Sequence, residues 1–183
     1  MSFTDKIDQT LASVYKNQET NVYRDLSLNI KKSLEEGALE EKDRYLTLLA
    51  CATAVGHSEL AKMAREILTS LDVPAEHIQE ASESAGIMGM LNTYYKFRGY
   101  VANAEPYSRA GLRMMTIGKP QLGKKVFEML AFAVSVVNGC PTCVGSHEEV
   151  LLKEGLSHDQ IHELARIASI TKGLSGLKFA QSL

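Results

Sequence analysis

The feature that most restricts the fold of this chain is an internal repeat. When the sequence of 183 residues is slid along itself by 83 positions, identical residues meet at many places and no gap is needed. The matched residues are Leu39 with Leu122, Lys42 with Lys125, Ala50 with Ala133, Gly56 with Gly139, Glu66 with Glu149, Leu68 with Leu151, Ile78 with Ile161, Glu80 with Glu163, Ala85 with Ala168, Ile87 with Ile170 and Leu91 with Leu174. Evenly spread matches favour the duplication of one structural unit. The two copies cover approximately 39–96 and 122–179.

The repeated unit is predicted to be helical. Ala, Leu, Glu, Lys and Met fill long segments at helical spacing, β-branched alternation is scarce, and the chain has only four prolines. We therefore expect an all-α fold with two pseudo-symmetric halves in a single domain, 1–183. The expected helices lie near 4–17, 20–36, 41–55, 58–71, 74–91, 105–116, 121–137, 140–154 and 157–171, with a short helix at the end.

Two local signals mark helix starts, and one segment marks a connection. Ser157 and Gln160 have the spacing of a capping box before an apolar run, and Pro74 suits the first turn of a helix. The segment 97–106 is less periodic and contains glycine and proline. We interpret it as a connection between the two halves within one domain.

The composition excludes several classes of partner. The chain has 20 basic and 22 acidic residues, a net charge of −2, and no basic run longer than a pair. This balance predicts binding neither to nucleic acid nor to an anionic membrane. The first residues lack a basic segment followed by an apolar core, and no apolar stretch has the length of a membrane span. We therefore expect a cytoplasmic protein.

Two of the three cysteines form a Cys140-x-x-Cys143 pair, and His147 follows four residues after Cys143. In a reducing compartment such a pair is more often catalytic or metal-binding than a permanent crosslink, and three cysteines are too few for a disulfide framework. The remaining cysteine, Cys51, lies in an apolar helical segment. We expect Cys51 to be a small buried apolar side chain.

A redox cysteine needs help to lose its proton, and the motif offers two sources of help. Gly139 can end one helix and Pro141 can begin the next, so Cys140 would lie at a helix N-terminus, where the dipole favours a thiolate. Cys143 and His147 would lie one turn apart on the same helix face. The first arrangement favours Cys140 as the attacking thiolate and the second favours Cys143. We choose Cys143, with Cys140 as the resolving thiol.

Glu128 interrupts the apolar run 126–134, where a carboxylate costs free energy unless it has a partner. A hairpin at Asn138 and Gly139 would reverse the chain. With a rise of about 1.5 Å per residue, Glu128 and His147 would then differ in depth by about one helical turn. They can meet directly or through one water. We predict a proton relay from Glu128 to His147 to a cysteine thiol.

The repeat fails at the predicted site. The pairs that differ there are Cys140 with His57, Cys143 with Leu60, His147 with Ala64, and Glu128 with Tyr45. One half is therefore predicted to carry the chemistry and the other to have kept only the scaffold. The other histidines have no thiol or carboxylate at a comparable spacing, and we assign no role to His57, His77, His158 and His162.

This combination of residues resembles the alkyl hydroperoxidase D family, within the carboxymuconolactone decarboxylase-like superfamily. The pattern is Glu128, eleven intervening residues, and then Cys140-x-x-Cys143-x-x-x-His147-Glu148. The chain length, the helical periodicity and the duplicated unit with one degenerate half are also similar to that family. The resemblance covers most of the chain beyond about its first forty residues.

The resemblance implies a thiol-dependent peroxidase and disulfide reductase in antioxidant defence, with no metal, flavin or other bound cofactor. It implies that dihydrolipoamide on a lipoyl-bearing protein reduces the disulfide, and that electrons pass to small organic peroxides or to a peroxiredoxin of the alkyl hydroperoxide reductase C type. A homotrimer is expected. The family's proton relay falls on Glu128, Cys140, Cys143 and His147. In well-studied members a further histidine precedes the second cysteine, whereas this chain has Thr142, whose hydroxyl cannot titrate near neutral pH.

Two alternatives stay open at this point. The chain could be a redox adaptor for protein disulfides or lipoamide with little peroxidase activity. It could instead be a zinc-binding helical protein, since Cys140, Cys143 and His147 are three plausible ligands, although no fourth lies at ligand spacing. One apolar and aromatic cluster hints at an oligomer but is more often core than interface: Met88, Met90, Leu91, Tyr94, Tyr95 and Phe97.

Overall fold

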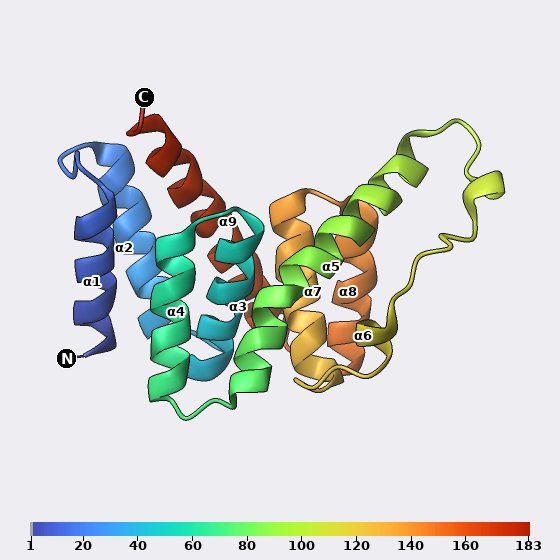
Figure 1. The fold of residues 1–183 in the computed structure, drawn as a ribbon, viewed down its shortest axis with the longest axis horizontal. Helices are drawn as coiled ribbons and strands as arrows, with labels where there is room; N and C mark the ends of the chain where they lie inside the picture. The colour runs from blue at the N-terminus through green and yellow to red at the C-terminus, as the bar shows by residue number, and fades with distance from the viewer. Residues whose placement is uncertain (1) are drawn as a thin grey trace.

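The computed structural model describes residues 2–183, and within that range it contains helices and no strand (Figure 1). The all-α prediction is confirmed. The elements are α1 (Phe3–Val14), α2 (Asn21–Glu35), α3 (Glu41–Ala54), α4 (Ser58–Ser70), α5 (Ala75–Tyr100), the 3-10 turn η1 (Glu105–Tyr107), α6 (Met115–Gly118), α7 (Lys124–Asn138), α8 (Pro141–Lys153) and α9 (His158–Ala180).

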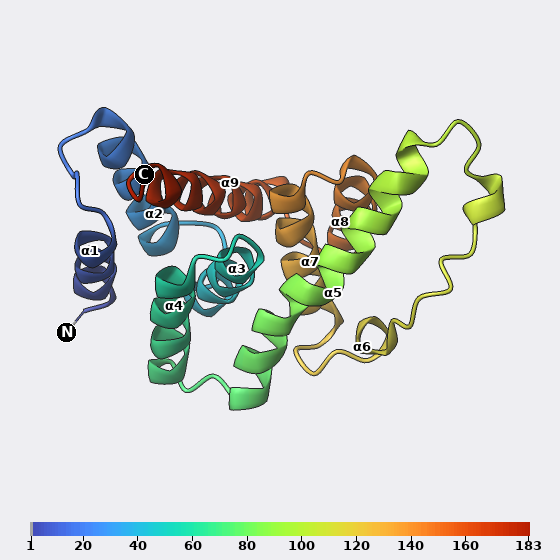
Figure 2. The same ribbon diagram turned by 45° about the horizontal axis from the view of Figure 1, so that its top comes forward.

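The duplication is visible in the helix positions. α7, α8 and α9 each begin 83 residues after α3, α4 and α5. α3 and α7 contact each other at the centre, and each of them also contacts both α5 and α9. α4 packs on α3 in one half, and α8 packs on α7 in the other. Figures 1 and 2 show these two groups on opposite sides, with α1 and α2 added beside the first.

The central helices form because they are apolar on nearly every side. In α3 every residue from Arg44 to Ala52 is buried, and in α7 every residue from Met129 to Ser135 is buried. A helix that is apolar all round is stable only when other helices surround it. The N-terminal helices are amphipathic by contrast, and α1 buries Ile7 and Leu11 on a single face.

A pair of buried carboxylates ties the two halves together. Glu163 on α9 accepts the amides of Ala38 and Leu39, at 2.6 and 3.1 Å, just before α3 begins. Glu80 on α5 accepts the amides of Gln121 and Leu122, at 3.0 and 2.7 Å, just before α7 begins. Each half therefore anchors the entry of the other half's central helix.

The structure corrects three helix predictions. The predicted helix at 105–116 is replaced by η1, an irregular segment and α6, because none of these residues is fully buried and burial therefore does not enforce one continuous helix. α5 continues nine residues beyond 91, through the segment interpreted as the start of the connection. α9 runs without a break to Ala180 instead of ending at 171 before a short last helix. The connection between the halves thus lies at 101–123.

Two further findings concern boundaries. Ser157 and Gln160 form the capping box at the start of α9, whereas Pro74 is the N-cap of α5 and precedes its first turn. None of the helices within 2–183 is long and apolar enough to cross a membrane. The single-domain assignment and the cytoplasmic location stay predictions.

Candidate active site

The turn between α7 and α8 carries the cysteine pair. α7 ends at Asn138, and Gly139 follows with a φ of 64°, in the left-handed region that glycine adopts at little cost. Cys140 is the N-cap of α8, and Pro141 occupies the first helical position. The Cys140 amide donates to the Ser135 carbonyl at 3.1 Å. The helix N-terminus expected at Cys140 is therefore present.

Cys140 and Cys143 are joined in a disulfide, with their Cα atoms 5.3 Å apart. Both residues are buried, with exposed fractions of 1% and 6%. The third cysteine, Cys51, is a free thiol fully buried in α3, where burial raises its pKa. Burial among apolar side chains thus keeps Cys51 protonated, whereas Cys140 and Cys143 are placed to form and break a disulfide.

Glu128 and His147 form a direct hydrogen bond between α7 and α8. The Nδ1 atom of His147 lies 2.6 Å from Oε2 of Glu128, and the two side chains are only 19% and 14% exposed. When the imidazole is neutral, a carboxylate partner at Nδ1 keeps the proton on that nitrogen and leaves the lone pair on Nε2. His147 can therefore accept a proton at Nε2 while Glu128 stabilises the resulting imidazolium.

A cavity of about 330 Å³ reaches this group of residues. Cys143 and His147 line it, whereas Cys140 and Glu128 do not. Its other walls come from α5, from α6 and the residue before it, and from the first turns of α8: Met88, Leu91, Tyr95, Met114, Ile117, Thr142 and Ser146. A small molecule in this cavity would meet the Cys143 side of the disulfide beside the imidazole, against a mostly apolar wall.

Most of the residues that line the cavity were not predicted from the sequence to belong to the site. Met88, Leu91 and Tyr95 belong to the cluster interpreted as more often core than interface. Met88 and Leu91 are buried in the core, and all three residues also form one wall of the cavity. Their spacing on α5 gives them a common helix face, which was the available signal. Met114 and Ile117 come from a segment whose helix prediction was wrong, so no periodicity could place them at the site.

In the first half, the residue that corresponds to Cys140 has a structural role. His57 is the N-cap of α4, where its Nδ1 accepts the Leu60 amide at 3.4 Å. Its Nε2 lies 2.9 Å from the Tyr15 hydroxyl, which donates to the Leu174 carbonyl at 3.0 Å. Because that hydroxyl proton is already used, Nε2 carries the imidazole proton. These hydrogen bonds join α4, α9 and Tyr15, the residue that follows α1. Burial lowers the pKa of His57.

The cavity-lining face of α8 differs from the matching face of α4 in how the neighbouring helix covers it. α1 packs on α4, and Leu60, Met63 and Ala64 are buried there in one core with Ile7 and Leu11. The counterparts of those three α4 residues are the cavity-lining Cys143, Ser146 and His147. The chain segment that corresponds to α1, residues 86–97, is part of α5, which contacts α8 and leaves a cavity between the two helices.

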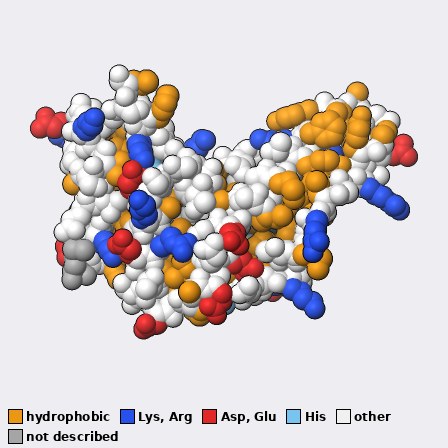
Figure 3. Space-filling view, viewed as in Figure 1, with side chains coloured by type: hydrophobic (Ala, Val, Ile, Leu, Met, Phe, Trp, Pro, Cys, Tyr) orange, Lys and Arg blue, Asp and Glu red, His pale blue; other side chains and the backbone are white. Residues whose placement is uncertain are grey.

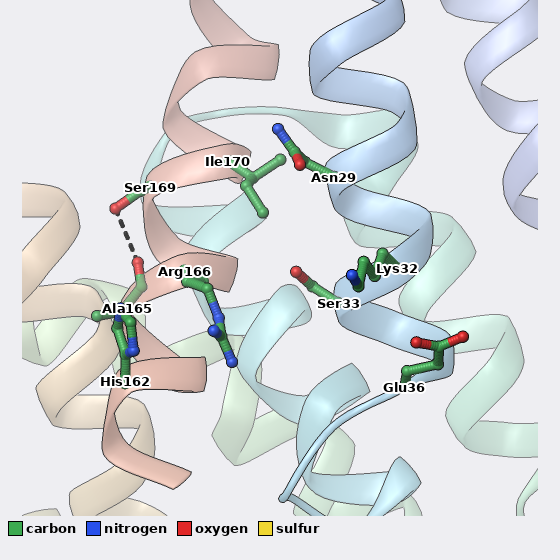
Figure 4. Close-up of a pocket in the computed structure, with 9 residues that line it drawn as sticks. All are labelled: Asn29, Lys32, Ser33, Glu36, His162, Ala165, Arg166, Ser169 and Ile170. Atoms are coloured by element: carbon green, nitrogen blue, oxygen red, sulfur yellow. Dashed lines mark hydrogen bonds between the residues drawn. The ribbon is translucent and has the colours of Figure 1, made fainter. Parts of the chain in front are cut away.

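A second cavity, of about 490 Å³, lies between α2 and α9 and shares no lining residue with the first (Figure 4). Polar and charged side chains make most of its lining: Asn29, Lys32, Ser33, Glu36, His162, Arg166 and Ser169, with Ala165 and Ile170. It contains neither a thiol nor a residue of the predicted relay. Over residues 2–183, no three His, Cys, Asp or Glu side chains are grouped as metal ligands would be.

The fold and the site together define a helical protein with a disulfide pair at the start of one helix and a carboxylate–imidazole pair beside it. Residues 106–181 match the model of the carboxymuconolactone decarboxylase family. The matched range includes the cavity residues of α6 and α8, the cysteine pair, Glu128 and His147.

Several relatives match over most of the chain. Alkyl hydroperoxide reductase AhpD of Mycobacteroides abscessus is 39% identical over 152 residues, which are 83% of this chain and 86% of the relative. The protein of the same name from Anaeromyxobacter dehalogenans strain 2CP-1 is 41% identical over 80% of this chain and 79% of its own length. That from Rhodococcus erythropolis is 38% identical over 87% and 89%. The chain belongs to the AhpD family.

Proposed function

We propose that the protein is a thiol-dependent peroxidase that reduces small organic hydroperoxides through the Cys140–Cys143 pair. The observation that carries the proposal is the cavity at which Cys143 and His147 meet, with Glu128 bonded to the imidazole at 2.6 Å. The names of the relatives, alkyl hydroperoxide reductase AhpD, support the same chemistry.

The first step is attack on the peroxide. His147 takes the proton of the Cys143 thiol, and the thiolate attacks the terminal oxygen of ROOH, which breaks the O–O bond. Cys143 becomes a sulfenic acid and RO⁻ leaves. The imidazolium returns the proton to RO⁻, giving the alcohol ROH. Glu128 stabilises the imidazolium while it exists, which is the role of a carboxylate held against Nδ1.

The second step closes the disulfide. The Cys140 thiolate attacks the sulfenic sulfur, and the hydroxyl leaves as water with the Cys140 proton. Dihydrolipoamide on a lipoyl-bearing protein then supplies two electrons and two protons to restore the dithiol and is oxidised to lipoamide. A peroxiredoxin of the alkyl hydroperoxide reductase C type is the second electron acceptor. In this cycle the electrons come from an external dithiol, so the protein itself needs no bound cofactor.

The test is peroxide consumption driven by dihydrolipoamide. With cumene hydroperoxide, we expect steady turnover by the native chain and its loss in Cys143→Ser. The matched control is Cys51→Ala, which removes the remaining thiol and should leave the rate within about twofold, because a buried protonated thiol takes no part. Turnover that survives Cys143→Ser would contradict the proposal.

A second candidate is a redox adaptor for protein disulfides or lipoamide. Thr142 favours it, because this residue lines the cavity next to Cys143 and its hydroxyl cannot supply a proton as an imidazole would. Steady-state rates with cumene hydroperoxide and with a small disulfide reporter, both driven by dihydrolipoamide, separate the two candidates. A rate with the reporter that exceeds the peroxide rate at least tenfold would favour the adaptor.

A further inference from the structure

A buried polar cluster lies behind the cysteine turn, where α5 passes over the end of α7 (Figure 1). Asn92 on α5 is fully buried, and its side-chain amide donates to the Ser135 hydroxyl at 2.9 Å. Its side-chain oxygen accepts a hydrogen bond from the side-chain amide of Asn138 at 2.9 Å. Asn92 therefore holds two residues of the last turn of α7 at once.

Two backbone contacts connect this cluster to the cysteine pair. The Lys96 ammonium, one turn along α5, donates to the Asn138 carbonyl at 3.0 Å. The Cys140 amide donates to the carbonyl of Ser135 at 3.1 Å. The chain from Ser135 to Cys140 is thus fixed from outside by α5, although Gly139 within it is exposed and lacks a side chain.

The first half of the molecule shows what the fold needs at these positions. The residues 83 positions away are Ser175 for Asn92, Ala52 for Ser135, Val55 for Asn138 and Phe179 for Lys96. A single hydrogen bond makes the equivalent tie, from the Ser175 hydroxyl to the Val55 carbonyl at 3.1 Å. The helices pack in the same way in both halves, so the larger cluster accompanies the cysteine pair and is not required by the scaffold.

We propose that Asn92 is a positioning residue that stabilises the Cys140–Cys143 disulfide relative to the dithiol. Cys140 is an N-cap residue whose side chain caps no backbone amide, so the position of its backbone depends on how the turn before α8 is held. Holding its backbone in the place that the disulfide requires lowers the entropy lost when the S–S bond closes. A hydrogen bond shifts the equilibrium only as far as it is stronger in the disulfide form than in the dithiol form, and losing two such bonds should shift it about tenfold towards the dithiol.

The proposal deepens the proposed function, because it concerns the same pair, and its readout does not require peroxide. In a dithiothreitol buffer, the protein disulfide takes two electrons and two protons from dithiothreitol to become the dithiol, and dithiothreitol becomes its cyclic disulfide. The fraction of protein dithiol at each buffer ratio, counted after trapping the thiols, gives the equilibrium constant.

The decisive variant places the residues of the first half in the second: Asn92→Ser, Ser135→Ala and Asn138→Val. These residues occupy the same places in a half that folds without the cluster. We expect an equilibrium shifted about tenfold towards the dithiol, which corresponds to about 30 mV. Circular dichroism checks that the variant is folded. If it is not, Asn92→Ser alone is used, with an expected shift of at least about threefold, since one hydrogen-bond network is only weakened.

The matched control is Ser175→Ala, which removes the equivalent tie in the first half and should leave the equilibrium within about twofold, as a site distant from the pair should. An unshifted equilibrium in a folded cluster variant would overturn the proposal, as would an equal shift in Ser175→Ala. If the native chain reacts with dithiothreitol but not with cumene hydroperoxide, the proposed function fails while this inference stands. If the native chain turns over peroxide normally and the cluster variant has an unshifted dithiol–disulfide equilibrium, only the inference about Asn92 is contradicted.

Discussion

Glu128 is a carboxylate in an otherwise apolar part of α7, between the buried residues Phe127 and Met129. Such a group costs free energy unless a partner compensates its lost hydration, and here the partner is His147 on the neighbouring helix. Burying the carboxylate–imidazole pair costs desolvation free energy, and the two helices already pack through apolar side chains without it. A chemical role explains why the carboxylate is there.

The first prediction is that Glu128→Gln lowers the dihydrolipoamide-driven peroxidase rate by about 10- to 100-fold, as loss of a group that supports a proton carrier does. Glutamine can still accept a hydrogen bond but cannot stabilise an imidazolium by charge. The disulfide should still form with a small oxidant, which thiol counting would show. Glu148→Gln, next to His147 on α8, is the control and should keep the native rate. A native rate in Glu128→Gln would contradict the proton relay.

His57 gives a pH prediction. Burial, with a smaller contribution from the Lys178 charge, lowers its pKa in the folded protein, while the Glu59 carboxylate opposes the shift. Below about pH 6.5 the unfolded chain therefore takes up a proton that the folded chain refuses. Between pH 7.5 and 5.5 the free energy of unfolding should fall by up to about 1.4 kcal/mol from this residue. Urea titrations of the native chain and of His57→Gln measure the difference, and equal losses in both would contradict it.

The arrangement of the candidate site at the residue scale could be predicted from the sequence because it depends on short spacings. One helical turn separates Cys143 from His147, and glycine and proline mark the turn that places Cys140 at a helix start. The direct contact of Glu128 with His147 follows from a hairpin whose reversal point is fixed by Gly139. Which thiol attacks does not follow from spacing, because both thiols have a source of activation.

At the scale of elements, the crossed carboxylates are the feature with the largest expected effect on stability. Glu163→Ala would leave the Ala38 and Leu39 amides without their acceptor and should lower the free energy of unfolding by about 2–4 kcal/mol, since hydrogen bonds to charged groups are worth more than neutral ones. Glu80→Ala should have a similar cost at the entry of α7.

Urea unfolding measures both variants against Glu83→Ala, an exposed carboxylate on α5 that should change stability by less than about 0.5 kcal/mol. A loss below that value in Glu163→Ala would mean that the entry loop of α3 finds other partners. Because the two carboxylates are related by the repeat, a large effect in only one would show that the halves are unequal in stability.

Helix prediction succeeded where burial enforces the pattern and failed where it does not. The buried central helices α3 and α7 were predicted within about three residues, because their apolar runs have no other stable form. The segment 105–116 has helix-forming residues but little buried surface, and propensity alone does not stabilise a helix of this length. The end of α5 was missed because the segment from Phe97, which contains Gly99, was interpreted as the connection, although a glycine near a helix end costs little.

At the scale of the whole molecule, exposed apolar side chains gather on the arm formed by the end of α5, the following loop and α6. Figure 3 shows this surface beside the helices that carry the site. Its exposed members are Met90, Phe97, Tyr100, Tyr107 and Met115. An apolar surface of this kind is typical of a contact with another protein, and it fits the homotrimer that the family resemblance leads us to expect.

Native mass spectrometry at micromolar concentration should therefore show a trimer. Tyr100→Asp should shift the protein towards monomer, because the trimer interface would bury this exposed side chain and burying a charge is costly. The control is Leu28→Asp on α2, a residue that is 63% exposed and lies outside this arm. A monomer in the native chain, or equal dissociation in both variants, would contradict the trimer.

The open cavity is the property of the whole molecule that the sequence could not supply. It depends on α5 leaving a cavity over α8 where α1 packs on α4, and on two residues of the connection, Met114 and Ile117, folding back to line it. No spacing within one element encodes either feature. This long-range arrangement decides that Cys143 lines the cavity while Cys140, a few residues away, does not.

The most direct measurement is the position of the sulfenic acid after brief peroxide treatment. Reduced Cys140→Ser and Cys143→Ser variants would be exposed to cumene hydroperoxide, trapped with a sulfenic-acid reagent and mapped by mass spectrometry. We predict a trapped sulfenic acid at Cys143 in Cys140→Ser and none at Cys140 in Cys143→Ser. A sulfenic acid that accumulates at Cys140 in Cys143→Ser would contradict the assignment of Cys143, beside Glu128 and His147, as the attacking thiolate.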